Sequence, residues 1–532
     1  MKMKKSFIGF NFLLGITFLF GQENPNVELP QFVITGKEAY EFPQLEKQKP
    51  ELISTVSVQF FKPLYSPDDL EVKEFSEPTM KSGEFLDSIN FINGEAEFQI
   101  GNNILPSLSL TYKLPSGRSM FSANVNALNQ RAYLPFADRN KFGAKLFYSY
   151  IISDSSDFLP FSKVQVSAFA ENESFKLFAS PLPDFNRQIV QGNVSTSLQN
   201  ITSEKFSYNI HLEDNYLSMK NDSVKENIFK VDGFAKYSAK VLDFSLMAKY
   251  HALQSTFDPL AQQTYGFIQA KAFIGLKVGS TIKTMFGFEF AGLDSDKTFF
   301  PYMAAALQVG KGLSFFAEYS PTSSMLTQQD FVKANRYYSP SATQINIFSS
   351  TTSRYAFNFK YEYERTFEVA SGFTIASVSS YPFYNFAAAG VNNFIIDTVE
   401  AKLTTISASF RLYPGKYGFF SGEFFFQNVK DTAENSIPNI SPLYASAVYG
   451  MFISPEISLS AEMMYYSSPF LNFANTEKGK DYFNISLKGE MIISEKMFAQ
   501  LELRNILNKK NEYWKNYQEL PLTITAGIKF NW

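Results

Sequence analysis

Two histidines, His211 and His251, are the only side chains of their type in the chain and the first candidates for acid–base chemistry. His211 is followed closely by Glu213 and Asp214, and a histidine beside carboxylates could form part of a hydrolase dyad. A histidine at the rim of a strand is the more frequent arrangement, and we favour it for both residues. No serine lies in a recognisable catalytic motif, and no His, Cys and Asp residues have the spacing of metal ligands. The sequence therefore predicts neither an enzyme nor a cofactor or metal site.

Aromatic side chains gather in two long segments that are otherwise polar, residues 320–354 and 380–399. With a nearby arginine, such rings could stack on a sugar or a peptide, or dock a partner protein. Alternatively, they form the outer aromatic girdle of a membrane protein or pack the loops against one another. The sequence leaves both alternatives open and favours the second. The candidate contact residues are Phe331, Arg336, Tyr337, Tyr338, Tyr381, Phe383, Tyr384 and Phe386.

The elements that must position these residues are strands with one apolar and one polar face. In the closing segment from Pro521 to Trp532, every even-numbered residue is apolar, and every odd-numbered residue after the proline is polar or glycine. A similar period of two recurs in residues 355–365, 456–466 and 481–491. Such alternation indicates strands that separate an apolar medium from a polar one.

Charged residues occupy the polar face in the middle of these strands, as at Lys360, Glu362, Lys488 and Glu490. The packed core of a soluble sandwich would exclude such charges, whereas the wet lumen of a barrel accepts them. No internal run of about 20 apolar residues exists, which argues against transmembrane helices. Together with 58 Phe and 29 Tyr, these patterns predict an all-β protein, a transmembrane antiparallel β-barrel.

The amino terminus predicts export. Lys2, Lys4 and Lys5 precede an apolar stretch from Phe7 to Phe20 that is too short to span a membrane, which is typical of a signal peptide over residues 1–21. The chain has no cysteine, so lipid attachment and disulfides are not expected. A signal peptide followed by alternating strands predicts the bacterial outer membrane, whose lipid contacts the barrel. The formal net charge of -3, without a basic stripe, argues against nucleic acid as a partner.

From Gly94 to Trp532, tight turns alternate with longer polar loops, as they do in outer-membrane barrels. This rhythm predicts about 22 strands, within a range of roughly 20 to 24. One of the tight turns is expected at residues 368–372. Residues 94–532 therefore form the barrel, and both of its ends are expected at the periplasmic rim.

Residues 22–93 are the only remaining material outside the barrel and the signal peptide. A barrel of about 22 strands has a wide lumen, and in known cases that lumen is plugged. This segment is too short for a folded plug and shows no clear succession of helices or strands. It is predicted to be a short extended segment that lies in the periplasm or in the lumen.

The stretch from Glu502 to Lys510, followed by Tyr513, Trp514 and the final strand, resembles the end of TonB-dependent receptors, where an "N-L-F-N-K-K-Y" turn precedes the last strand. Near the start of the mature chain, Leu29 to Gly36 resembles the TonB box or the lead-in to the plug of that family. The predicted strand number agrees with the family's barrel, but the family's plug has no recognisable counterpart here. The resemblance implies a partner strand for TonB at Phe32, Val33, Ile34, Thr35 and Gly36. It also implies that Phe530 and Trp532 form the signal that the barrel-insertion machinery reads.

Two functions remain. In the first, the protein transports a nutrient across the outer membrane in the manner of TonB-dependent receptors. In the second, it is a non-transporting barrel subunit of a multiprotein outer-membrane assembly, which docks another periplasmic or outer-membrane protein through its amino-terminal segment and its loops. The sequence does not identify a substrate.

Overall fold

A computed structural model of the chain describes residues 93–532, apart from positions 154, 157–158, 201–204, 258–260, 280, 310–311, 341–345, 364–365, 387–393 and 414–417. The predicted signal peptide and the TonB-box-like residues Phe32, Val33, Ile34, Thr35 and Gly36 lie outside the described residues. Their roles stay predictions from the sequence.

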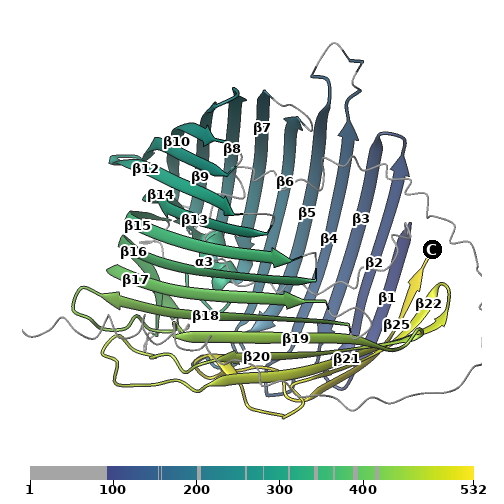
Figure 1. The fold of residues 1–532 in the computed structure, drawn as a ribbon. Coiled ribbons are helices and arrows are strands. Elements are labelled where there is room, and N and C mark those ends of the chain that lie inside the picture. Colours follow the sequence, from purple (N-terminus) through teal and green to yellow (C-terminus); the bar gives the residue numbers. More distant parts are fainter. Residues whose placement is uncertain are drawn as a thin grey trace, which may run out of the picture. The chain divides into compact units, whose positions relative to one another are not determined.

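The described part of the chain is a single antiparallel sheet that closes on itself (Figure 1). Consecutive strands pair with each other, except that β13 and β14 both pair with β15, and β25 closes the ring by pairing with both β22 and β1. The sheet strands are β1 (Gly94–Gly101), β2 (Ile104–Ser116), β3 (Ser119–Gln130), β4 (Arg139–Ile151), β5 (Ser162–Lys176), β6 (Asn186–Asn200), β7 (Phe206–Met219), β8 (Val224–Ser238), β9 (Leu242–Phe257), β10 (Ala261–Val278), β11 (Ile282–Leu293), β12 (Asp296–Val309), β13 (Leu313–Tyr319), β14 (Thr322–Thr327), β15 (Asn346–Tyr363), β16 (Phe367–Phe386), β17 (Phe394–Leu412), β18 (Phe419–Asp431), β19 (Leu443–Ser454), β20 (Ile457–Tyr466), β21 (Tyr482–Ser494), β22 (Met497–Arg504) and β25 (Thr523–Asn531).

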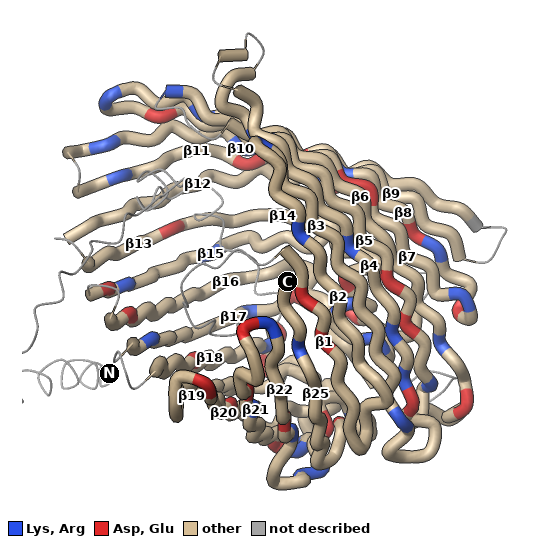
Figure 2. The backbone as a smooth tube through the Cα atoms, turned by 90° about the vertical axis from the view of Figure 1, so that its right-hand side faces the viewer, with Lys and Arg blue, Asp and Glu red and all other residues tan. Residues whose placement is uncertain are grey.

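The 23 sheet strands occupy 22 positions in the ring, because β13 and β14 are two pieces of one strand that both pair with β15. The strand is interrupted between them at Ser320 and Pro321, where the proline has no N–H to donate to the neighbouring strand. The predictions of a closed antiparallel barrel and of about 22 strands are therefore confirmed. Figure 2 shows β22, β25 and β1 side by side at the seam, next to the carboxyl terminus.

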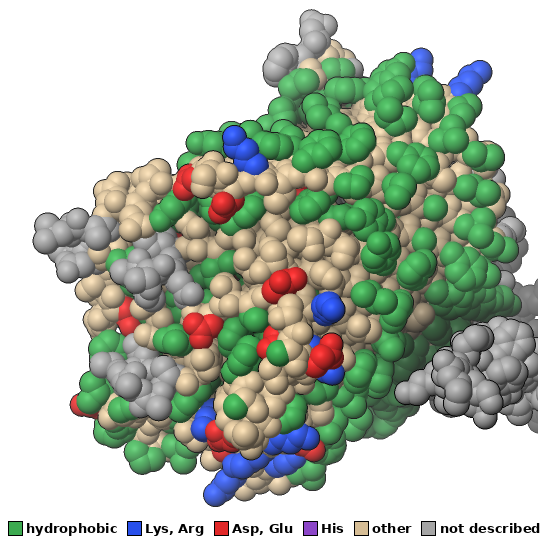
Figure 3. Space-filling model, turned by 90° about the vertical axis from the view of Figure 1, so that its left-hand side faces the viewer, with side chains coloured by type: hydrophobic (Ala, Val, Ile, Leu, Met, Phe, Trp, Pro, Cys, Tyr) green, Lys and Arg blue, Asp and Glu red, His purple; other side chains and the backbone are tan. Residues whose placement is uncertain are grey.

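The alternation along the strands separates the two faces of the wall. On the outside, Leu501 and Ile528 expose 50% and 52% of their surface, and hydrophobic side chains cover the flank of the barrel in Figure 3. On the inside, Lys529 pairs with Glu490 at 2.7 Å, and Gln500 donates to the same carboxylate at 2.9 Å. The predicted assignment of apolar positions to lipid and of charged positions to the lumen holds for these strands.

The two rims of the barrel differ. At one rim the strands are joined by short turns, as at Gly117, which adopts a positive φ of 56° between β2 and β3. At the other rim the connections carry a 3-10 helix, η2 (Lys220–Asp222), a helix, α3 (Gln328–Ala334), and a small hairpin of β23 (Glu512–Trp514) and β24 (Tyr517–Gln518). In barrels of this kind the short turns face the periplasm and the long loops face outward. Among the described residues, no helix is long and apolar enough to cross a membrane.

One predicted turn is wrong. Residues 368–372 lie within β16, which begins at Phe367. Gly372 lies at a crowded point, because a Cβ on it would approach Ser407 Oγ at 2.7 Å and Asn358 Oδ1 at 2.8 Å, and these side chains would have to shift. The glycine that suggested a turn therefore marks a crowded point on the lumenal face of a long strand.

Candidate functional site

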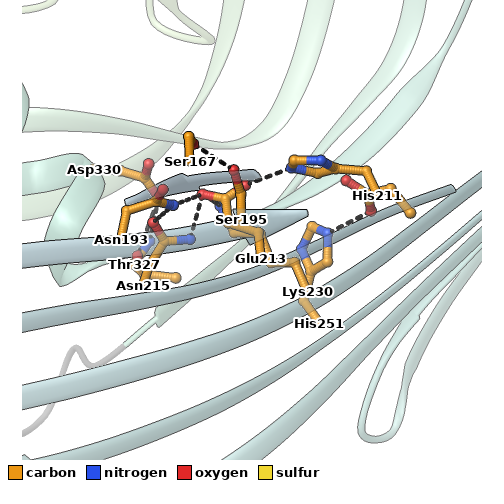
Figure 4. Close-up of polar contacts among 11 residues, drawn as sticks. Ser167, Asn193, Ser195, His211, Glu213, Asn215, Lys230, His251, Thr327 and Asp330 are labelled. Atoms are coloured by element: carbon orange, nitrogen blue, oxygen red, sulfur yellow. Dashed lines mark hydrogen bonds and ion pairs between the residues drawn. The ribbon is translucent and has the colours of Figure 1, made fainter. Parts of the chain in front are cut away.

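A polar belt lines the lumen on strands β5 to β9. Ser167 lies opposite Ser195 in the strand register, and Ser195 lies opposite Glu213. Glu213 lies opposite Lys230, which in turn lies opposite His251. Figure 4 shows these side chains projecting from neighbouring strands toward one another. We define the polar belt as Ser167, Asn193, Ser195, His211, Glu213, Asn215, Lys230, Asp232 and His251.

Glu213 is the centre of the belt. Its Oε1 accepts hydrogen bonds from Asn193 Nδ2 at 2.8 Å and from Asn215 Nδ2 at 2.6 Å. Its Oε2 lies 3.2 Å from His211 Nε2, and Lys230 Nζ lies 3.9 Å from Oε1. The carboxylate is thus held by four polar neighbours, all on the same stretch of wall.

His251 has a similar environment, because its Nε2 lies 3.2 Å from Asp232 Oδ1. Each of the two histidines thus has a carboxylate partner on the belt. The hydroxyl of Ser195 is 2.7 Å from that of Ser167, and the described contacts of the belt place no serine hydroxyl on a histidine. The belt therefore offers hydrogen-bond donors and acceptors to a polar solute rather than an activated nucleophile.

An apolar collar lies above the belt, nearer the rim that carries the long loops. On β7 the lumenal side changes from Asn215 to Leu217 and Met219, which are 1% and 0% exposed. The collar consists of buried side chains from the upper ends of β5 to β11: Phe175, Ile189, Leu217, Met219, Val224, Ile228, Leu253, Phe257, Phe267 and Leu293. Because these side chains point into the barrel and yet are buried, another element must cover them.

The covering element is the segment after β14, which we call the strap and define as residues 328–340. It begins with α3, where Thr327 and Asp330 form a capping box. Phe331 and Val332 of this helix are 3% and 7% exposed and belong to the same apolar cluster as the collar. Figure 1 shows α3 between the front and back walls of the barrel. The strap therefore lies inside the barrel mouth.

Buried polar side chains fix the strap to the inner wall at β6 and β8. Arg187 on β6 is 0% exposed and forms a two-point ion pair with Asp222, with Nε and Nη2 donating at 2.9 and 2.7 Å. Its Nη1 donates to the carbonyl oxygens of Arg336 and Tyr338 in the strap, at 2.9 and 2.7 Å. On β8, Glu226 accepts from the backbone N–H of Gln328 at 3.0 Å. These bonds satisfy backbone groups that would otherwise be buried without partners.

Aromatic rings pack the strap against the neighbouring loops and the wall. The ring of Tyr337 stacks on that of Tyr517 in β24, with centroids 3.6 Å apart, and meets Phe175 and Phe178 edge-on at 5.8 and 6.4 Å. Burial in this cluster raises the pKa of Tyr337 to about 12. Trp514 of the same hairpin packs on the ring of Phe394 at 5.2 Å. The cluster joins loops that lie far apart in the sequence.

The structure places the predicted loop aromatics in two groups. Phe331 is in α3, and Arg336, Tyr337 and Tyr338 follow it in the strap; Phe331 and Tyr338 are only 3% and 0% exposed. The other group is on a strand instead of a loop, because β16 continues to Phe386 and pairs with β17 up to that residue. This second group is Tyr381, Phe383, Tyr384 and Phe386. Tyr384 joins the two groups by donating from its hydroxyl to the carbonyl of Phe331 at 2.6 Å.

Several residues of this arrangement carry no signal in the sequence. Arg187 and Glu226 are charged residues in polar surroundings, and their partners in the strap follow more than 100 positions later. Only the apolar side chains of the collar on lumenal positions could have indicated that something covers them. At the seam, Trp532 exchanges backbone hydrogen bonds with Gly94, both 3.0 Å; its role in insertion stays a prediction.

Comparison of the sequence with protein-family models and with curated proteins gives no match. Solved structures do match the barrel. The FrpB iron transporter from Neisseria meningitidis has a TM-score of 0.64 at 10% identity, over 84% of this chain and 82% of that one. The siderophore receptor PiuA from Acinetobacter baumannii has a TM-score of 0.62 at 9% identity (82% and 81% covered), and the copper transporter OprC has 0.62 at 8% (83% and 80%).

The fold is that of a TonB-dependent receptor barrel. The resemblance predicted from the closing stretch is confirmed at the level of the barrel. A closed barrel of 22 strands with an apolar outer face spans the bacterial outer membrane, as the sequence predicted. Within the described residues, no group of three or more His, Cys, Asp or Glu side chains is placed to hold a metal ion.

Proposed function

We propose that the protein carries a nutrient across the outer membrane and performs no catalysis. The observation that carries this proposal is the polar belt, a set of hydrogen-bonding side chains on the inner wall of a closed barrel. Its donors and acceptors replace the water that a polar solute gives up on entering the lumen. The related barrels named above are described as transporters and receptors, for iron, siderophores and copper.

The energy for uptake would come through TonB. The extended segment around Val33, preceded by Pro30 and followed by Gly36, is punctuated so that a short strand can form and stop. Such a strand can add to the sheet edge of a partner through backbone hydrogen bonds. We propose that Phe32, Val33, Ile34, Thr35 and Gly36 form this strand and that TonB is the partner.

The test is growth of a strain lacking the gene on media in which one nutrient is limiting, including iron complexes, copper, sugars and peptides. The wild-type gene should restore growth on at least one of these nutrients. A Val33→Pro variant should not restore it, because proline removes a ladder donor. Val33→Ala keeps the backbone N–H and is the matched control, which should restore growth.

The second candidate, a non-transporting subunit of an outer-membrane assembly, gives a different result. In that case no nutrient distinguishes the strains, and proteins that co-purify with the wild-type chain are lost with Val33→Pro but retained with Val33→Ala. If Val33→Pro changes neither growth nor partners, the segment is a tether and the proposal of energised uptake fails.

A further inference from the structure

We propose that the strap, residues 328–340, closes the outer mouth of the barrel, and that entry of a solute from outside requires its release from the Arg187–Asp222 ion pair. This proposal does not depend on transport, since a barrel subunit of an assembly would be sealed in the same way. It concerns only described residues of the barrel.

The contacts of the strap show that it follows the inner wall of the mouth, because Gln328 at its start is already bonded to Glu226 on β8. Counted from β1, the joint strand of β13 and β14 is the thirteenth position and β5 is the fifth, so they are eight positions apart. In a ring of 22 positions the largest possible separation is eleven. Arg336 of the strap nevertheless reaches Glu173 on β5, with its Nη1 at 3.2 Å from the carboxylate. The segment therefore runs along the inside of the mouth, past β8 and β6, to a wall eight positions from its root.

Another contact joins the strap to a loop from a different side of the ring. The hairpin of β23 and β24 lies between β22 and β25, the twenty-first and twenty-second positions, which are eight and nine positions from the root of the strap in the other direction. Tyr337 contacts this hairpin through Tyr517 and contacts β5 through Phe175. Tyr337 thus lies between the wall at β5 and a loop from a different side of the ring, so that the strap and the hairpin together span the mouth.

The contacts of the strap are of the kind found in a packed interior. Phe331 and Val332 cover the apolar collar, so lifting the strap would expose these side chains to water at about 25 cal/mol per Å² of apolar surface. Arg187 and Asp222 are 0% and 5% exposed in their side chains. A buried ion pair of this kind is costly to break at one partner, because the other charge is left uncompensated. The strap is therefore held closed by interactions that must be separated together.

The absence of cysteine in the chain allows a direct test of access from outside. Ser195 lies on the polar belt of β6, eight residues along the strand from Arg187 toward the short-turn rim, and so below the strap. A Ser195→Cys variant in intact cells is treated with a membrane-impermeant maleimide that carries a polyethylene glycol chain. A second reporter, Lys480→Cys, has a side chain that is 67% exposed among the outer loops and is the accessible reference.

With the strap intact, Ser195→Cys should react far more slowly than Lys480→Cys. Adding Arg187→Met should raise the rate at Ser195→Cys by at least about tenfold, because both hydrogen bonds from Arg187 Nη1 to the strap carbonyls are lost. The rate at Lys480→Cys should stay unchanged. Arg354→Met is the matched control, since it removes a paired arginine from β15 whose partners, Glu318 and Ser320, lie outside the strap.

Retention of compact migration on a gel without heating shows that each variant is a folded barrel. If Arg187→Met does not fold, Asp222→Asn keeps the shape of the side chain while removing the charge, and it should also speed the reaction. The proposal is overturned if Ser195→Cys reacts as fast as Lys480→Cys with the strap intact. It is equally overturned if a folded variant without the ion pair leaves the rate at Ser195→Cys unchanged.

Discussion

The polar belt and the apolar collar are two regions of the same inner wall, on the same strands, and they differ in what covers them. On β7, Glu213 and Asn215 of the belt are followed at the next two lumenal positions by Leu217 and Met219 of the collar. Nothing in the backbone changes between them, since the pairing with β8 continues without a shift. The difference arises because the collar is packed against the strap. The lumenal face is therefore largely apolar where the strap covers it, apart from the buried anchors Arg187 and Glu226.

The sharpest way to break this comparison is to place the same charge in both regions. Ile228 of the collar is 2% exposed, so Ile228→Lys should lower the free energy of unfolding by about 3–5 kcal/mol, the scale of an uncompensated buried charge. Ser195→Lys in the belt should have little effect, because the amine can reach lumenal water. Denaturant unfolding in detergent or lipid measures both. Equal losses would mean that belt and collar are covered alike.

A second prediction concerns the strap itself. Phe331→Ala removes a side chain that is 3% exposed and should destabilise the strap by about 3–5 kcal/mol, the range for such truncations in a packed core. Hydrogen exchange should then accelerate at the amide of Asn335, which donates to the Phe331 carbonyl at 2.9 Å. Phe424→Ala, on the outer face at 43% exposure, is the control. Unchanged exchange in Phe331→Ala would show that the collar does not hold the strap.

The outer face provides a third test, because it too is apolar but is covered by lipid. Leu487 is on the outer face of β21 and Lys488 is on the lumenal face. Leu487→Arg should cost about 2–4 kcal/mol at mid-membrane and reduce the amount of assembled barrel, whereas Lys488→Leu should be tolerated. Quantifying folded barrel in the outer membrane decides this. A similar loss in the two variants would contradict the assignment of the faces.

The smallest effect is expected in the belt. His251→Leu removes the contact with Asp232, whose side chain is 32% exposed. Ion pairs and hydrogen bonds that remain in contact with water contribute less than about 1 kcal/mol, so the unfolding free energy should change little. A loss of more than about 2 kcal/mol would place the belt in a dry environment, as in the collar.

The sequence predicted the barrel because its strands obey a simple period. Alternation from Pro521 to Trp532 identified the faces, and the rhythm of turns and loops predicted the observed number of strands. The turn expected at residues 368–372 was wrong, because a glycine can occupy a crowded point of a strand as well as a turn. The strap could not be predicted, since its partners on β5 and β6 are distant in the sequence and charge alone does not specify which carboxylate Arg336 meets.

The break between β13 and β14 has a mechanical consequence. Directly after Pro321, the chain is hydrogen-bonded to β11, where Glu289 accepts from the backbone N–H of Ser323 at 3.0 Å and from the hydroxyl of Thr322 at 2.9 Å. The strap therefore resembles a beam that is supported at both ends, at its root by Glu289 and at its far end by Arg187 and by the bridge between Tyr338 and Phe394. The deflection of such a beam vanishes at its supports. Loss of the Arg187 support would therefore free the far end, Arg336 to Tyr338, and leave Thr322 and Ser323 in place.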